Sequence, residues 1–290
     1  MSTQYENDVL RFNDLRPLTS KISENQAAAE TDTYGGRSLA TVFASEIASY
    51  SDAWAWLKAR TAAGNFKRLR LGDYIDVPLT GESQTVRYMI GAIDPYYQCG
   101  DQTKRHYIAM VPKAPVAIND DEWKTTSGTY VYWNNPATNN GTEEQPNPYL
   151  ASNLHRWEIE AFYPKLPQAV KDVIYSQRML LETRYSASGL LTDSTGWAWA
   201  DMGPVWSLSE TEVYGCCIWG TKGYSVGLDC QFPIFKLAKD RLLGSRVAWW
   251  LRSACSGSSA GVCCVNPSGY AGWGSAALAY IRPRPCFLVG

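Results

Sequence analysis

One stretch near the C-terminus constrains the fold more than any other. Between Ser253 and Tyr280 the chain has no charged residue and consists mainly of Ser, Gly, Ala and Cys. Two segments that look like structural framework enclose it, WWLRS (249–253) and YIRPRPCF (280–287). We therefore expect residues 67–290 to form one domain, with Trp249 and Trp250 buried in its core.

Composition and charge narrow the function classes. The chain has 290 residues, a net charge of −1 and no basic block, so nucleic acid and anionic membrane are not expected as main partners. It has no apolar run of the roughly 20 residues that a membrane span needs, so no membrane insertion is expected. The N-terminus lacks the basic-then-apolar order of a signal peptide, which predicts synthesis in the cytoplasm and a soluble protein.

No enzyme or metal-site motif stands out. The eight cysteines show no CxxC spacing, which argues against zinc, and free thiols are expected. The two histidines, His106 and His155, have no recognisable nucleophile motif beside them. The carboxylate pairs Asp120-Asp121 and Glu143-Glu144 lie in polar loops, where solvated charge is the simpler interpretation. We therefore expect a protein that is not an enzyme and binds no cofactor, calcium, copper or zinc.

Residues 1–65 are predicted to be an N-terminal arm followed by a helical segment. Residues 1–37 are polar and broken at Gly35-Gly36, whereas residues 38–64 carry apolar residues at helical spacing. Ser38 can cap the helix, Gly64 can end it, and Ser51-Asp52 can divide it in two. The positions expected to be buried are Leu39, Val42, Phe43, Ile47, Tyr50, Trp54 and Leu57.

Residues 66–290 are predicted to form an α+β domain with long packed loops. Alternating patterns at 68–80, 84–94 and 105–113 indicate three strands, and a loop is expected over 119–149. Residues 151–177 indicate two helical pieces broken at Pro164 and Pro167, and a capping box from Ser209 to Glu212 marks a further helix. The expected buried set of the two pieces is Leu154, Trp157, Phe162, Leu166, Val170 and Ile174.

The charge-free segment itself is typical of a strand, a turn at 267–269 and a second strand, with 276–283 as a further strand. Alternate side chains of a strand share a face. The predicted inward set is Cys263, Val265, Ala271, Ala277, Ala279 and Ile281, and the outward set is Cys264, Asn266, Tyr270, Gly272, Leu278 and Tyr280. An outward face with a thiol and aromatic rings but no charge is poor solvent surface. It indicates either a binding face or a face that another domain or subunit covers.

At these residues the sequence resembles a known family. The pieces WWLRS, GYA and YIRPRPCF, with RYSASGLLTDSTGWAWAD (184–201) and WGTKGYSVGLDCQFPIF (219–235), resemble variable proteins of diversity-generating retroelements. Members of that family have a C-type-lectin fold and are often carried by phages of gut bacteria. The resemblance covers about 66–290 and implies a C-type-lectin-like domain with a variable region at about 253–280.

The family's mechanism implies a compositional test. Errors at the adenines of AAC-type codons give residues such as Tyr, Cys, Gly, Ser, Leu, Ala and Asn, but not Lys, Glu, Gln, Met or Trp. Those excluded residues are absent from 253–280 apart from Trp273, which needs another template codon. The ligand-binding residues that the resemblance implies are Gly261, Cys264, Asn266, Ser268, Tyr270, Gly272, Trp273, Gly274, Leu278 and Tyr280. The framework that it implies is Trp249, Trp250, Arg252, Cys263, Val265, Ala271, Ala279 and Arg282.

The resemblance implies a receptor-binding protein, in the phage tail tip or another host-attachment part of the virion. Its partner would be a host-cell surface protein or glycan, and a homotrimer is a possible assembly. Two alternatives stay open. The fold is shared with formylglycine-generating oxidases, for which Cys255 with Cys263 or Cys264 would be the cysteine pair. The triplet Gln145–Asn147 is of the kind that ligates calcium in sugar-binding lectins, although no Trp-Asn-Asp partner follows.

Overall fold

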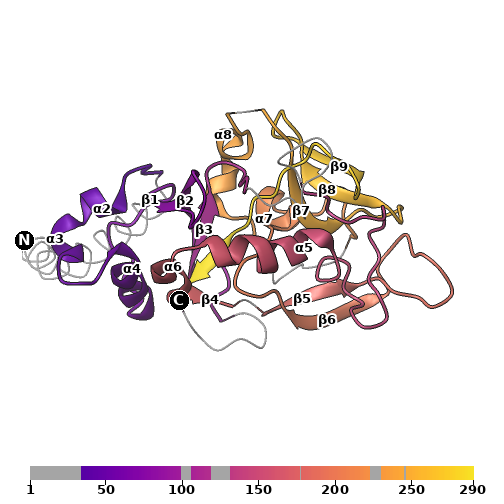
Figure 1. Ribbon diagram of the computed structural model, residues 1–290, viewed down its shortest axis with the longest axis horizontal. Helices are drawn as coiled ribbons and strands as arrows, with labels where there is room; N and C mark the ends of the chain where they lie inside the picture. The colour runs from indigo at the N-terminus through magenta and orange to yellow at the C-terminus, as the bar shows by residue number, and fades with distance from the viewer. Residues whose placement is uncertain (1–33, 99–105, 119–130, 177, 223–229, 245) are drawn as a thin grey trace, which may run out of the picture.

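The computed structural model describes residues 34–98, 106–118, 131–176, 178–222, 230–244 and 246–290. In Figure 1 the N-terminal helices lie at one end of the molecule, and the strands of the charge-free segment lie toward the other. The C-terminal strand returns from that far end to the central sheet. The predicted N-terminal arm lies mostly outside the described residues, as do Cys99 and the pair Asp120-Asp121.

The predicted helical segment forms three short helices, α2 (Leu39–Val42), α3 (Ala44–Ile47) and α4 (Ala53–Ala62). The division falls at Asp52, whose carboxylate accepts the backbone N–H groups of Trp54 and Ala55 and so caps α4. Ser38 is the N-cap residue of α2, at the predicted helix start, although its side chain makes no capping hydrogen bond. Tyr50 is exposed, against expectation, because it lies in the turn between α3 and α4.

A five-stranded antiparallel sheet forms the centre of the fold, in the order β1-β2-β3-β10-β4. Its strands are β1 (Tyr74–Pro78), β2 (Thr85–Ile93), β3 (Ile108–Pro112), β4 (Ile174–Tyr175) and β10 (Phe287–Val289). The first three are the strands that the alternating pattern predicts. The last strand of the chain inserts between β3 and β4, so the charge-free segment is enclosed by the fold and is not a tail.

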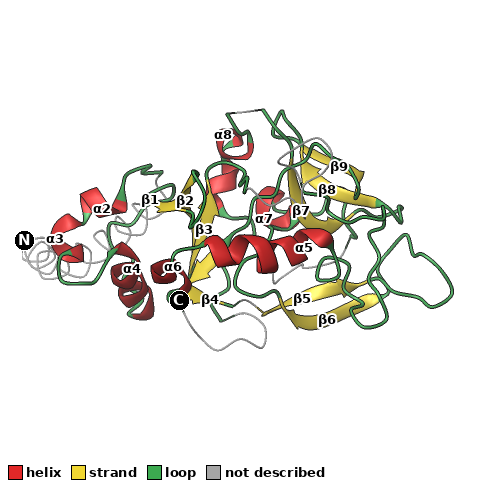
Figure 2. Cartoon of the chain, in the orientation of Figure 1, coloured by secondary structure: helices red, strands yellow, loops and turns green. Residues whose placement is uncertain are grey.

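The predicted helical pieces before β4 are four short turns, α5 (Asn153–Trp157), a π-helical turn η1 (Glu158–Phe162), a 3₁₀ turn η2 (Tyr163–Lys165) and α6 (Gln168–Lys171). Figure 2 shows these helices beside the strands. The breaks fall near the two prolines, as expected. The expected buried set is confirmed except for Ile174, which is half-buried in β4.

Two smaller sheets complete the fold. Strands β5 (Arg178–Thr183) and β6 (Gly196–Asp201) form a two-stranded ribbon, and β7 (Trp249–Ala254), β8 (Gly261–Val265) and β9 (Ala271–Ser275) form a three-stranded sheet. Between them lie α7 (Glu210–Tyr214), η3 (Pro233–Lys236) and α8 (Ala238–Arg241). The capping box predicted from Ser209 to Glu212 is present at the start of α7. The mixture of helices and antiparallel sheets confirms the α+β class.

The core has two hydrophobic clusters, one on each side of the central sheet. One contains Trp249 and Trp250 with the three-stranded sheet, and the other contains the buried residues of α2 and α4 with strands β1–β3. The helices before residue 66 therefore pack in the same hydrophobic cluster as residues of strands β1–β3. No helix within the described ranges is long and apolar enough to span a membrane.

Candidate functional site

The charge-free segment forms the hairpin that its sequence predicts, but both faces of its first strand are covered. Strand β8 pairs with β9 so that Cys263 lies opposite Trp273 and Cys264 opposite Gly272. All five residues of β8 are buried, including Cys264 at 5% exposure. The expectation that Cys264 faces outward is wrong, because β8 is the middle strand of its sheet and is packed on both sides.

The predicted binding residues separate into exposed and enclosed groups. Tyr270 (71% exposed), Tyr280 (60%) and Trp273 (51%) project from the surface. Ser268 is also exposed, Asn266, Gly272 and Leu278 are half-buried, and Gly261, Cys264 and Gly274 are buried. The last three have no surface to offer a ligand. Of the predicted framework, Trp249, Trp250, Arg252, Cys263 and Val265 are buried, and Ala271, Ala279 and Arg282 are half-buried.

Residues 276–283 do not form the further strand that the alternating pattern predicts. The chain turns after β9, with the Leu278 N–H donating to the Ser275 carbonyl oxygen at 3.0 Å. The end of the Leu278 side chain lies over Gly274, so a side chain at position 274 would require Leu278 to shift, and Leu278 is half-buried against the main core. Leu278 therefore belongs to the packing of the hairpin, whereas Tyr280 remains exposed.

The loop that joins β7 to β8 is held through its backbone by side chains from elsewhere in the chain. Asn139 donates from Nδ2 to the carbonyl oxygens of Ser258 (2.8 Å) and Gly261 (2.5 Å). Arg184 donates from Nη1 to the carbonyl oxygens of Cys255 (3.0 Å) and Ser258 (3.2 Å). Both donors are fully buried. Because these bonds use main-chain oxygens, the bonds themselves do not depend on which side chains the loop carries.

A buried ion pair fixes strand β7 to helix α7. Arg252 reaches Glu212 through two bonds, Nη1 to Oε2 at 2.6 Å and Nη2 to Oε1 at 3.0 Å, and it also donates to the Ser207 carbonyl oxygen. Tyr96 donates its hydroxyl to the same carboxylate, and Glu212 accepts the Ser209 N–H in the capping box. Arg252 therefore has the structural role expected of a framework residue, because its side chain joins strand β7 to helix α7.

A tryptophan that the sequence did not single out adjoins the exposed face of the hairpin. The indole ring of Trp219 lies 6.5 Å from that of Trp273, centroid to centroid, at an interplanar angle of 56°. Its Nε1 donates to the Ala271 carbonyl oxygen at 3.3 Å. Its backbone carbonyl accepts the Ser256 N–H at 2.8 Å. The only sequence signal was an aromatic residue in the turn-rich stretch CCIWGT, without helical or alternating spacing.

The loop that carries Trp219 is anchored by one buried carboxylate. Glu210, at the start of α7, accepts backbone N–H groups from Ile218 at 2.8 Å, Trp219 at 3.1 Å and Gly220 at 2.9 Å. Three such bonds satisfy the carboxylate and orient the loop. Ile218 and Trp219 are each 42% exposed despite this anchoring. Ile218 and Trp219 therefore form an exposed apolar surface whose backbone is held in place by Glu210.

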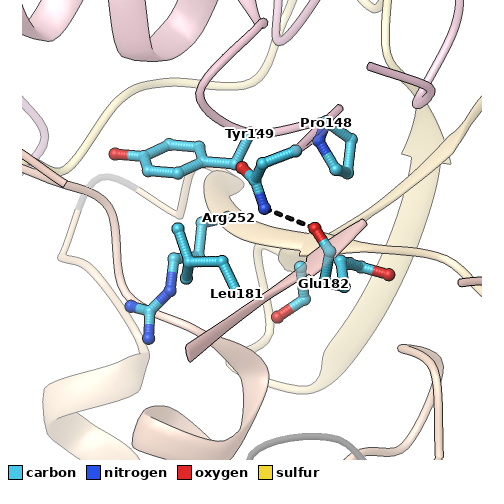
Figure 3. Close-up of a pocket in the computed structure, with 7 residues that line it drawn as sticks. Pro148, Tyr149, Leu181, Glu182 and Arg252 are labelled. Atoms are coloured by element: carbon cyan, nitrogen blue, oxygen red, sulfur yellow. Dashed lines mark hydrogen bonds between the residues drawn. The ribbon is translucent and has the colours of Figure 1, made fainter. Parts of the chain in front are cut away.

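The interior beneath β7 contains a small cavity, lined by Pro148, Tyr149, Leu181, Glu182 and Arg252 (Figure 3). Its volume is about 10 Å³, which is room for one water molecule at most. The bond drawn there runs from Asn147 Nδ2 to the Glu182 carbonyl oxygen, at 2.6 Å. A small-molecule substrate does not fit this cavity.

The buried carboxyl of Glu158 makes stability depend on pH. Burial is the main cause that raises its pKa from 4.5 to about 8, and Ser207 and Tyr149 donate hydrogen bonds to it. A raised carboxyl pKa means that the folded state binds more protons than the unfolded state, so stability falls as pH rises from about 4.5 through about 8. We expect a melting temperature several degrees lower at pH 9 than at pH 6. Thermal melts of Glu158→Gln should show a clearly flatter dependence, and an unchanged slope would contradict this assignment.

The cysteines near the site are buried thiols. Cys255, Cys263 and Cys264 are free, and burial is the main cause that raises the pKa of each, in Cys264 to about 12. They therefore stay protonated at neutral pH, which suits packing rather than nucleophilic or metal chemistry. Within the described ranges, no group of three or more His, Cys, Asp or Glu side chains is arranged to hold a metal ion.

Fold and site together define an α+β protein with an exposed aromatic surface on backbone-anchored loops. Residues 109–290 match the family described as Domain of unknown function (DUF6273). The match covers more than half of the chain, and the protein belongs to this family. It begins within β3 and includes the whole candidate site. No curated protein and no solved structure matches the chain.

Proposed function

We propose that this chain is a binding protein that recognises a receptor on a host cell through the exposed surface of its β8–β9 hairpin. The fold would be C-type-lectin-like, and the setting a phage tail tip or another host-attachment part of a virion. The observation that carries the proposal is the contrast at the hairpin: Tyr270, Trp273 and Tyr280 project from the surface, whereas every residue of the neighbouring strand β8 is buried. Exposed aromatic residues of this kind supply much of the energy of binding interfaces.

The backbone anchoring supports a diversified surface. Asn139 and Arg184 lie outside the charge-free segment and bind its carbonyl oxygens, which every residue type has. In the β7–β8 loop, side chains can therefore change without removing these contacts. In the β8–β9 turn, Asn266 Oδ1 accepts the N–H groups of Ser268 and Tyr270 at 2.9 and 3.0 Å, so a change at position 266 would remove those two bonds. The variable set is accordingly reduced to the exposed or half-exposed members of the predicted set whose side chains neither pack on the core, as Leu278 does, nor hold the turn, as Asn266 does. These are Ser268, Tyr270, Gly272, Trp273 and Tyr280.

Observations weigh against the two alternatives. An oxidase of the formylglycine-generating type needs an available cysteine pair, whereas Cys255, Cys263 and Cys264 are buried with raised pKa values. A calcium lectin needs free oxygens in the Gln145–Asn147 triplet. Here Asn147 Oδ1 accepts the Leu150 N–H at 2.8 Å, so it already serves the local turn.

The test is binding of the labelled full-length chain to a panel of gut bacterial strains, measured by flow cytometry. We expect at least one strain to be bound by the native chain and not by the triple variant Tyr270→Ser, Trp273→Ser, Tyr280→Ser. The variant should keep its melting temperature, because exposed substitutions usually cost within about ±0.5 kcal/mol each. Leu278 is not replaced in this variant, because its half-buried side chain packs against the main core. Failure to bind any strain, or equal binding by both proteins, would contradict the proposal.

A further inference from the structure

Two of the exposed large apolar side chains, Trp219 and Trp273, meet at one place, and only Trp273 belongs to the predicted binding set. Ile218 and Trp219 come from the loop after α7, and Trp273 comes from the edge strand β9. These segments are joined by the bond from Trp219 Nε1 to Ala271 O and by the ring contact between the two tryptophans. Clustered exposed apolar side chains of this kind mark interaction sites on soluble proteins.

The backbone of the loop half of this surface is held from α7. Its position is set by Glu210 through the three N–H groups of Ile218, Trp219 and Gly220. A change of side chain at position 273 would leave these bonds in place. The surface thus has one half whose geometry is fixed from α7 and one half that lies in the charge-free segment.

The chemistry of the surface points to a ligand without charge. Residues 215–221 and 254–280 carry no charged side chain, and the Glu210 carboxylate is buried and already accepts three N–H groups. What the two segments offer is indole rings, an isoleucine, serine and threonine hydroxyls, and main-chain groups. Apolar C–H faces of a pyranose ring pack on indole rings, while sugar hydroxyls pair with hydroxyl and main-chain groups. An acidic or basic partner would find no opposite charge within these two segments, and the exposed Lys222 directly follows the first of them.

We propose that Trp219 and Trp273 form one composite platform that binds a neutral cell-surface polysaccharide, without calcium. This rests on the proposed host-binding function and names the ligand class for it. Trp219 is then a binding residue contributed from outside the charge-free segment.

The experiment uses a strain that the native chain binds. Its surface polysaccharide is extracted with hot phenol, digested with proteinase K and passed over an anion exchanger, and the neutral fraction is the probe. We expect this fraction to compete with cell binding and to change tryptophan fluorescence, with or without a chelator. Trp219→Ala and Trp273→Ala should each weaken binding at least tenfold. Trp197→Ala is the matched control, because Trp197 is 41% exposed but lies on β6, and it should bind normally.

Failure of the polysaccharide inference and failure of the host-binding proposal give different results. If cells are bound but protease treatment of the cells abolishes binding and periodate oxidation does not, the ligand is a protein, so the polysaccharide inference fails and the host-binding proposal stands. If only the acidic fraction competes, the neutral class is wrong. If Trp219→Ala binds like the native chain while Trp273→Ala does not, the composite platform is wrong. If no strain is bound, the host-binding function fails and this inference fails with it.

Discussion

Replacing Trp250 with alanine should lower the free energy of unfolding by roughly 3–5 kcal/mol, because a large buried ring leaves a cavity that its surroundings fill only in part. Trp250 is fully buried, and its Nε1 donates to the Val131 carbonyl oxygen at 2.9 Å. It lies opposite Cys264 in the pairing of β7 with β8, so its loss would loosen the hairpin that carries the exposed face. Urea or thermal unfolding of the purified chain gives the measurement.

The matched control is Trp273→Ala, the same change on the edge strand of the same sheet. Trp273 is half-exposed, so its removal should cost within about 0.5 kcal/mol. Similar losses in the two variants would mean that Trp273 belongs to the core. A loss below about 1 kcal/mol in Trp250→Ala would show that the framework role of Trp250 is wrong, since truncations of buried Trp cost several times more.

Replacing Arg252 with alanine should be comparably severe, at roughly 3–5 kcal/mol, because it leaves a buried carboxylate without its partner. Arg252 and Glu212 are almost completely buried, at 3% and 0% side-chain exposure. The combined variant Arg252→Met, Glu212→Gln should recover a large part of that loss, because no uncompensated charge remains. Equilibrium unfolding of both variants is the measurement.

A surface pair of the same geometry serves as the control. Arg87 contacts Asp76 through two bonds of 2.7 and 2.9 Å, but its side chain is 37% exposed and that of Asp76 43%. Arg87→Ala should therefore cost at most about 1 kcal/mol. Equal costs at the two sites, or no recovery in the combined Arg252 variant, would show that burial of the charge is not what matters.

The sequence predicted best where one pattern decides the structure. Alternation placed β1, β2 and β3, and the serine-to-glutamate spacing placed the start of α7. Trp249 and Trp250 were correctly assigned to the core because large aromatics next to the apolar run of β7 have no other place to pack. In each of these cases the information is local to a few neighbouring residues.

Face assignments in the charge-free segment were less successful, for a physical reason. Alternation tells which side chains share a face, but not whether a second layer covers that face. Cys264 is enclosed because β8 is a middle strand, and that depends on β7 and β9 together. Residues 276–283 alternate in sequence and yet turn after β9, where the Leu278 N–H donates to the Ser275 carbonyl oxygen and Leu278 packs over Gly274. The contact between Trp219 and Trp273 joins residues 54 positions apart, which no local pattern encodes.

The proposed diversified surface is tested most directly by sequencing the 3′ end of this gene and the DNA beside it from many independent isolates. If the surface is diversified, a reverse-transcriptase gene and a near-copy of the 3′ end should lie nearby. Amino-acid changes should concentrate at the exposed positions Ser268, Tyr270, Trp273 and Tyr280 and at the half-exposed Gly272. Codons for Trp250, Arg252, Cys264 and Gly274 should stay constant, because their side chains or backbone are enclosed. Changes spread equally over buried and exposed codons, with no reverse-transcriptase gene nearby, would contradict the claim that a fixed scaffold carries a diversified binding surface.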